Sequence, residues 1–82
     1  MSELEMRHEL KTLIEEVMEL DNFGDDDNFV TELGMDSVMA LEMVARIEKR
    51  YRIRIPEERF TQMKTLNDVV RIVAEILPLV KS

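Results

Sequence analysis

Residues 33–38 read Leu33-Gly34-Met35-Asp36-Ser37-Val38, and this stretch predicts the start of a helix. Asp36 is a preferred N-cap residue, because its carboxylate accepts hydrogen bonds from backbone N–H groups that the first turn leaves unpaired. Ser37 would then lie on the first turn with an exposed primary hydroxyl. A phosphate ester there would lie at the positive end of the helix dipole, which stabilises it by about 0.3–1 kcal/mol. The position suits carrying a phosphate-linked group better than catalysis.

Two helices are predicted on either side of that start. The helix that begins at Ser37 runs to about Tyr51. An earlier helix opens with Ser2-Glu3-Leu4-Glu5, a capping-box pattern in which a serine and a glutamate satisfy each other's backbone groups. Its apolar residues recur every three or four positions and form one face; they are Met6, Leu10, Leu13, Ile14, Val17 and Leu20.

The last third of the chain predicts two more helical segments. Residues 53–55 are extended, since the residue before Pro56 is pushed out of the α region. Pro56 suits the first position of a short third helix from Glu57 to about Met63. Thr65-Leu66-Asn67-Asp68 then caps a fourth helix that ends near Pro78. Its apolar face consists of Val69, Ile72, Val73, Ile76 and Leu77. The expected fold class is therefore all-α, a four-helix bundle with a long first loop.

That loop, from Asp21 to Met35, is longer than most loops in compact domains, which favours a functional or anchored segment. We expect Phe29, Val30 and Leu33 to hold it against the core, with a single helical turn. The acidic spacing in residues 21–32 resembles a calcium loop, but Phe23 stands at a ligand position and Asp26 where the turn needs glycine. No specific metal site is expected. Weak binding of divalent ions by residues 25–27 stays open.

The second helix has more apolar residues than one buried face needs. At about 100° per residue, its presumed core face comprises Ala40, Met43, Val44, Ile47 and Tyr51. Val38, Leu41 and Ala45 fall on nearly the opposite side, and Glu42 and Glu48 flank them. One alternative is a central helix that is buried nearly all round. The other is an exposed apolar strip beside Ser37, the expected footprint of a partner protein.

Composition restricts the class of protein. The chain has 82 residues, enough for one domain over residues 1–82, and no cysteine, which excludes disulfides and cysteine-based metal sites. It begins without the pattern of a signal peptide and lacks an apolar stretch of membrane-spanning length, so we expect a soluble, cytoplasmic protein. His8 is the only histidine and is expected to be exposed. With no Gly-x-Ser-x-Gly elbow either, Ser37 is not expected to be a hydrolase nucleophile.

The charge is strongly asymmetric along the chain. The net charge of −7 argues against a nucleic-acid partner, because phosphates demand a basic surface. Residues 1–45 hold thirteen acidic and two basic residues, whereas residues 46–82 hold five acidic and nine basic ones. Such a pattern is either ordinary solvated helix surface or a polarised surface that orients protein partners.

The quoted stretch, together with Leu41-Glu42-Met43-Val44, Ile47-Glu48, Tyr51 and Ile55-Pro56, closely resembles the acyl carrier proteins. The resemblance covers the whole chain, and the combination of these spacings is far more specific than the Asp-Ser pair alone. It implies that a phosphopantetheinyl transferase esterifies Ser37 with 4'-phosphopantetheine from coenzyme A, using magnesium. The terminal thiol of that arm would hold acyl groups as thioesters, which accounts for a carrier without cysteine.

The same resemblance assigns roles to neighbouring residues. Asp36 would help the transferase and the partner enzymes recognise the serine, while Val38, Leu41 and Glu42 match recognition positions of the family. With Ala45 and Glu48, these residues form the expected partner-binding surface for acyl-transferring and ketosynthase-type enzymes. A nascent acyl chain would enter the bundle against residues such as Ala40, Val44 and Leu66. A monomeric carrier that is not itself an enzyme is expected, because successive partners must reach the second helix.

The chain departs from the fatty-acid-synthesis pattern at two places. The end of the second helix and the following loop are basic, with Arg46, Lys49, Arg50, Arg52 and Arg54, and Met39 replaces a polar or acidic residue. Partners of the fatty-acid type use basic patches, and like charges across an interface are costly. This favours a specialised carrier in a polyketide-like or other dedicated pathway. The alternatives are an aminoacyl or peptidyl carrier, against which Met35-Asp36 argues, and an unmodified helical adaptor.

Overall fold

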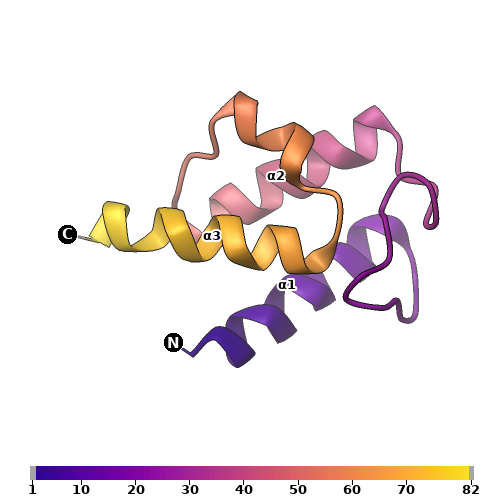
Figure 1. Ribbon diagram of the computed structural model, residues 1–82, viewed down its shortest axis with the longest axis horizontal. Coiled ribbons are helices and arrows are strands. Elements are labelled where there is room, and N and C mark those ends of the chain that lie inside the picture. Colours follow the sequence, from indigo (N-terminus) through magenta and orange to yellow (C-terminus); the bar gives the residue numbers. More distant parts are fainter. Residues whose placement is uncertain (1, 82) are drawn as a thin grey trace.

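A computed structural model describes residues 2–81 and shows an all-helical chain over that range. The elements in order are α1 (Glu3–Met18), α2 (Ser37–Tyr51), the 3-10 helix η1 (Glu57–Gln62) and α3 (Leu66–Lys81). Helix α1 packs against both α2 and α3, and the long loop between α1 and α2 closes one end of the bundle (Figure 1). The prediction of an all-α fold with a long first loop and a short third helix is confirmed.

Helix α1 begins at the predicted N-cap residue, but the Glu5 carboxylate bonds to the Ser2 hydroxyl and not to the Ser2 backbone N–H that a capping box uses. Ser2 is the N-cap, and its hydroxyl oxygen accepts a hydrogen bond from the backbone N–H of Glu5 at 3.1 Å. The same hydroxyl donates to Oε1 of Glu5, also at 3.1 Å. Most of the predicted apolar face is buried, with Leu10 and Ile14 completely so. Leu13 and Leu20 are only partly buried at its margin.

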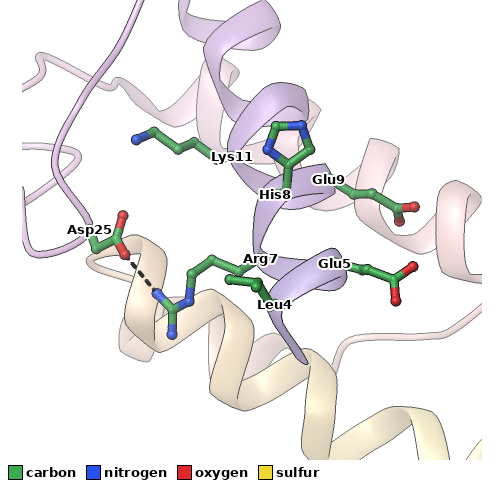
Figure 2. A pocket seen from close by; sticks show the side chains of 7 residues that line it. All are labelled: Leu4, Glu5, Arg7, His8, Glu9, Lys11 and Asp25. Carbon is green, nitrogen blue, oxygen red and sulfur yellow. Dashed lines mark hydrogen bonds and ion pairs between the residues drawn. The ribbon is translucent and has the colours of Figure 1, made fainter. Parts of the chain in front are cut away.

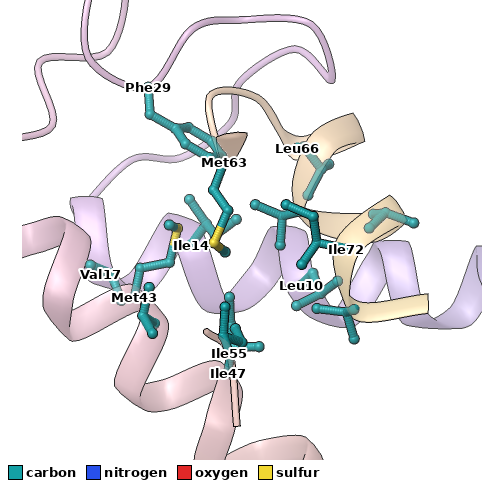
Figure 3. Close-up of a cluster of buried hydrophobic side chains, with 14 of the residues drawn as sticks. Leu10, Ile14, Val17, Phe29, Met43, Ile47, Ile55, Met63, Leu66 and Ile72 are labelled. Atoms are coloured by element: carbon teal, nitrogen blue, oxygen red, sulfur yellow. The ribbon is translucent and has the colours of Figure 1, made fainter. Parts of the chain in front are cut away.

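The core consists mainly of aliphatic and methionine side chains contributed by α1, α2, α3 and the segments between them (Figure 3), and η1 adds only the partly buried Phe60. Its completely buried members include Leu10, Ile14, Phe29, Ile47, Leu66 and Ile72. The described residues have no buried polar or charged side chain in this core. Hydrophobic burial therefore accounts for the packing of the three long helices.

Aromatic contacts anchor the long loop. Phe23 and Phe29 are both buried and meet edge to face, with ring centroids 6.1 Å apart. The Phe29 N–H donates to the Lys64 carbonyl at 2.9 Å, which joins the loop to the segment before α3. A helical turn follows, in which Asn28 Oδ1 accepts from the Val30 N–H and the Asn28 carbonyl accepts from the Leu33 N–H. The single helical turn in this loop is confirmed.

The prediction that Val30 holds the loop against the core was wrong. Its side chain is 62% exposed, whereas Phe29 is completely buried and Leu33 partly buried. On one helical turn, adjacent residues point about 100° apart, so Phe29 and Val30 cannot both face inward.

Polar side chains fasten the loop at a second place. Arg7 of α1 donates through Nη1 to Asp25 Oδ2 and to Asn67 Oδ1 at the start of α3. Asn67 in turn donates to Asp26 through its amide nitrogen. Three segments that are distant in sequence are thus joined by one network, and the carboxylates of residues 25 and 26 are engaged in it.

Two helix boundaries differ from the sequence predictions. Pro56 is the extended N-cap of η1, with ψ of 143°, so it is not the first helical residue. The segment is a 3-10 helix, because its hydrogen bonds span three residues, as from the Arg59 N–H to the Pro56 carbonyl. It ends at Gln62. Helix α3 passes through Pro78 and ends at Lys81. Because proline has no backbone N–H, it cannot donate the helical hydrogen bond to the Ala74 carbonyl. Ala74 is exposed, so water can bond to that carbonyl instead.

Candidate functional site

Ser37 is the first residue of α2 and is exposed, as predicted. Asp36 is its N-cap residue: its Oδ1 accepts from the Met39 N–H at 2.8 Å, and its carbonyl accepts from the Ala40 N–H at 2.9 Å. Extended backbone at Asp36 changes to helix at Ser37. The cap therefore fixes where the serine hydroxyl emerges.

The preceding residues hold this start in place. Gly34 has a φ of +77°, a left-handed conformation that L side chains rarely adopt. Met35 follows with its side chain buried, and its N–H donates to the Phe29 carbonyl at 2.8 Å. The exposed serine thus lies two residues beyond a buried anchor, on backbone that is tied to the core.

A groove of about 650 Å³ opens beside Ser37, between the long loop, α2 and η1. Its walls are largely apolar, from Val30, Met35, Ala40, Leu41, Met43, Val44, Phe60 and Met63. Polar side chains also line it, from Asn28, Thr31, Ser37, Thr61 and Lys64. Ala40 and Val44, which were expected beside an acyl chain, line this groove. Leu66 does not line it, because this residue faces the core from the first turn of α3 and is completely buried.

The side of α2 that faces away from the core is open to solvent. Val38 is 73% exposed and Leu41 60%, and Ala45 and Glu42 are also exposed. The alternative of a helix buried nearly all round is therefore wrong. On the core side, Met43, Val44 and Ile47 are buried as predicted. Ala40 and Tyr51 are only partly buried, because each lies at the edge of that face.

Glu48 has a local contact that the sequence did not indicate. Its side chain is half-buried, and Oε2 accepts a hydrogen bond from the Ile55 N–H at 2.8 Å. This carboxylate holds the segment after α2 against the helix. The neighbouring Glu42 pairs with Arg46 at 3.0 Å, and Arg46 also lies 3.7 Å from Glu16 of α1.

The end of α2 is joined to α1 through Glu9. The Tyr51 hydroxyl donates to Glu9 Oε1 at 2.9 Å, and Arg50 pairs with Glu9 Oε2 at 3.1 Å. The hydrogen bonds from Tyr51 and Arg50 lower the pKa of Glu9. Burial, followed by the hydrogen bond to Glu9, raises the pKa of Tyr51 to about 12.

A titration of Tyr51 tests this contact. Because the folded pKa lies above the usual value of 10.0, the stability from this group is fully present below pH 10. It is lost as the pH rises through about 12. Tyr51 is the only tyrosine, so tyrosinate absorbance reports it directly. We expect a midpoint near 12 in the folded protein, and weaker alkaline destabilisation in Tyr51→Phe. A folded-state midpoint near 10 would contradict the contact.

Other candidate sites are not assembled. Asp27 Oδ2 accepts from the Gly24 N–H at 2.7 Å, and Asp25 pairs with Arg7 at 3.1 Å. Within residues 2–81, no group of three acidic or histidine side chains could hold a metal ion.

His8 is exposed, and it lines a hollow of about 560 Å³ on α1 with Leu4, Arg7 and Lys11 (Figure 2). Among the described helices, none is long and apolar enough to cross a membrane.

The exposed serine, its cap residue and the adjoining apolar groove thus lie together at the start of α2. A family model described as "Phosphopantetheine attachment site" matches residues 8–77. The chain belongs to the acyl carrier protein family, whose members carry 4'-phosphopantetheine and act as carriers rather than catalysts.

Individual relatives agree with this assignment. The chain is 33% identical over 73 residues to a polyketide-8 synthase acyl carrier protein 2 of Streptomyces avermitilis, across 87% of this chain and 84% of that one. It is 32% identical over 71 residues to an acyl carrier protein of Streptomyces coelicolor, across 87% and 76% respectively.

A solved structure shares the fold. BlmI of Streptomyces verticillus, a type-II acyl carrier protein involved in bleomycin biosynthesis, superposes with a TM-score of 0.80 at 16% identity, across 89% of this chain and 87% of that one. The chain is an acyl carrier that works with biosynthetic enzymes.

Proposed function

We propose that Ser37 is the residue to which 4'-phosphopantetheine is attached in this chain. The observation that carries this proposal is an exposed serine hydroxyl on the first turn of α2, at an apolar groove of about 650 Å³. The group supplies a terminal thiol that can hold an acyl cargo, and the chain itself has no cysteine.

The residues around Ser37 fit a phosphate ester. The hydroxyl faces solvent, so the ester meets no core atom, and the helix dipole favours negative charge at this end of α2. Asp36 already satisfies the Met39 N–H and adds its own negative charge. Repulsion between this carboxylate and the phosphate directs the arm away from Asp36. We propose that Asp36 positions the serine for the transferase.

The apolar groove is the observation that favours an acyl cargo. Its wall residues Ala40, Val44 and Phe60 offer small or partly buried apolar surface. Ser37 lines the same groove. Burial of apolar surface is worth about 25 cal/mol per Å², so a hydrocarbon chain would gain from lying there. Asn28 and Thr61 offer hydrogen-bonding groups to a cargo with oxygen substituents.

An acyl cargo distinguishes this proposal from its two alternatives, an aminoacyl or peptidyl carrier and an unmodified adaptor. The test is to treat the protein with coenzyme A, magnesium and a broad-specificity phosphopantetheinyl transferase, then offer either an acyltransferase with its acyl substrate or an amino-acid-activating enzyme. We expect a mass gain of one acyl group only in the first reaction. Loading by the amino acid enzyme alone favours the aminoacyl carrier, and no gain at any step favours the adaptor.

We propose that partners bind the open side of α2 through the exposed residues Val38, Leu41, Glu42 and Ala45, with the half-buried Glu48 at the edge of this surface. The partners are the transferase and the acyl-transferring and ketosynthase-type enzymes of a dedicated, polyketide-like pathway. The 33% identity to a polyketide synthase carrier and the basic end of α2 support this pathway class. We further propose a single carrier domain over residues 1–82 that is a cytoplasmic monomer without catalytic activity of its own, since each enzyme must reach the same helix.

Leu41→Asp tests the partner surface. An exposed leucine at a protein interface supplies apolar area, and replacing it by a charge should lower the kcat/KM of the transferase by about 10- to 30-fold, as for an interface hot spot. Leu4→Asp is the matched control, because Leu4 is 76% exposed but lies on α1. Equal loading rates for the two variants would contradict the proposed surface.

A further inference from the structure

The C-terminal end of α2 and the segment after it form a basic region. Residues 46–56 contain five basic residues and one acidic residue, Glu48, whose carboxylate is engaged by the Ile55 N–H. Arg46 and Arg50 are paired with Glu42 and Glu9. Lys49, Arg52 and Arg54 are exposed, and within residues 2–81 no carboxylate lies within ion-pair distance of them. We call these three residues the basic surface.

A concave site adjoins the basic surface. A cleft of about 810 Å³ lies between α1 and α2, and Lys49 and Arg52 line it together with Arg46 and Arg50. The acidic side chains in its walls, Glu9 and Glu16, already face Arg50 and Arg46 at 3.1 and 3.7 Å. The cations that remain unpaired there are available to a carboxylate from outside.

The basic surface is electrostatically separate from the acidic start of α2. Arg52 follows Ser37 by fifteen positions, about 22 Å along the helix axis. The Debye length is about 8 Å at physiological ionic strength, so the acids near the serine are largely screened at that distance. A partner therefore meets the Asp36 carboxylate at the N-cap of α2 and the basic surface at and beyond its C-terminal end as separate charges.

The backbone conformation at Arg52 does not require an arginine side chain. Arg52 is the C-cap of α2, with φ of 56° and ψ of 49°, and only its N–H is used there, toward the Glu48 carbonyl. Glycine adopts this left-handed conformation with less strain. What distinguishes Arg52 is its place: the side chain is exposed, has no ion-pair partner among residues 2–81, and lines the cleft.

We propose that the basic surface binds an acidic patch on an enzyme that acts on the cargo of this carrier. This inference rests on the proposed function and adds the charge of the partner to it. A protein partner is favoured over nucleic acid or an anionic membrane, because the net charge of −7 repels extended polyanions while leaving a local patch of three cations. The expected enzyme face is acidic opposite the end of α2.

Ketosynthases of opposite surface charge test this inference. The probes are a ketosynthase of fatty-acid synthesis with a basic carrier-binding surface and its variant with those basic residues replaced by glutamate. We expect the wild-type carrier, loaded with its acyl group, to react with the acidic variant at a kcat/KM about tenfold higher, and this preference to shrink as salt rises. Arg52→Glu should reduce the preference at least about threefold.

Two further variants separate charge at this surface from other effects. Arg71→Glu makes the same change in net charge on α3 and should keep the preference. Arg52→Gly should unfold at an equal or higher temperature than the wild type, yet reduce the preference as Arg52→Glu does. Glu19, at φ of 56°, shows that the fold accommodates glutamate in this conformation, so Arg52→Glu should also fold.

The outcomes distinguish the inference from the proposed function. Loading by the transferase is measured first on every variant, and absent loading of the wild type would overturn the proposed function itself. Normal loading with no preference for the acidic ketosynthase, or with equal preferences in Arg52→Glu and Arg71→Glu, would overturn only the inference. Arg52-dependent binding to phosphatidylglycerol vesicles or to duplex RNA at physiological salt would also overturn it, in favour of that partner.

Discussion

Phe29→Ala is expected to lower the free energy of unfolding by about 3–5 kcal/mol. Phe29 is completely buried in the core although it comes from a loop, and its ring meets Phe23 edge to face. Truncation leaves a cavity that a loop tied by the Phe29 N–H to the Lys64 carbonyl cannot easily close. Urea unfolding followed by circular dichroism measures the loss.

The adjacent Val30→Ala is the matched control. Val30 is 62% exposed on the same turn, and an exposed substitution is expected to change stability by no more than about 0.5 kcal/mol. Similar losses in the two variants would show that the loop is not anchored through Phe29 alone.

Ser37→Ala is expected to abolish loading with phosphopantetheine while leaving the fold intact. Alanine has no hydroxyl to esterify, and the position is exposed, so the expected change in stability is within about 0.5 kcal/mol. Intact mass after incubation with coenzyme A and the transferase measures the loading, and thermal unfolding measures the stability.

Ser2→Ala should give the opposite result. Ser2 caps α1 through the Glu5 N–H, and loss of such a cap costs about 1 kcal/mol. This variant should therefore be less stable but load fully. A mass gain that persists in Ser37→Ala, or one that disappears in Ser2→Ala while the protein is folded, would contradict the assignment of the serine.

Local chemistry explains which features could be predicted from the sequence. The cap at Asp36, the capping pattern at Ser2 and the buried face of α1 depend on neighbours within one or two helical turns. The same holds for the exposure of Val38 and Leu41, which follows from helical periodicity. These features place Ser37 at the start of α2 without knowledge of the tertiary fold.

Other features depend on segments far apart in the chain. The groove beside Ser37 requires the positions of the loop and of η1 relative to α2, so Phe60 and Met63 could not be recognised as lining residues. Leu66 has the right size and polarity for a cavity wall but faces the core. Whether a helix continues through Pro78 likewise depends on its surroundings.

The positions of the charged residues could be read from the sequence, but their pairing could not. The sequence shows acidic and basic residues in different halves, but it does not show that Arg50 and Arg46 are paired across to α1. Nor does it show that Glu48 is engaged by the Ile55 N–H. Within residues 46–56, these contacts leave Lys49, Arg52 and Arg54 as the basic residues available to a partner, a set that defines a surface rather than a charge balance.

Peptide mass mapping of the wild-type protein, after loading with coenzyme A and the transferase, shows directly whether Ser37 carries the cargo arm. We expect one phosphopantetheine per chain, on the peptide that contains Ser37, with the ester assigned to that residue by fragmentation. A phosphopantetheine on any other residue, or a folded protein that takes up none, would contradict it.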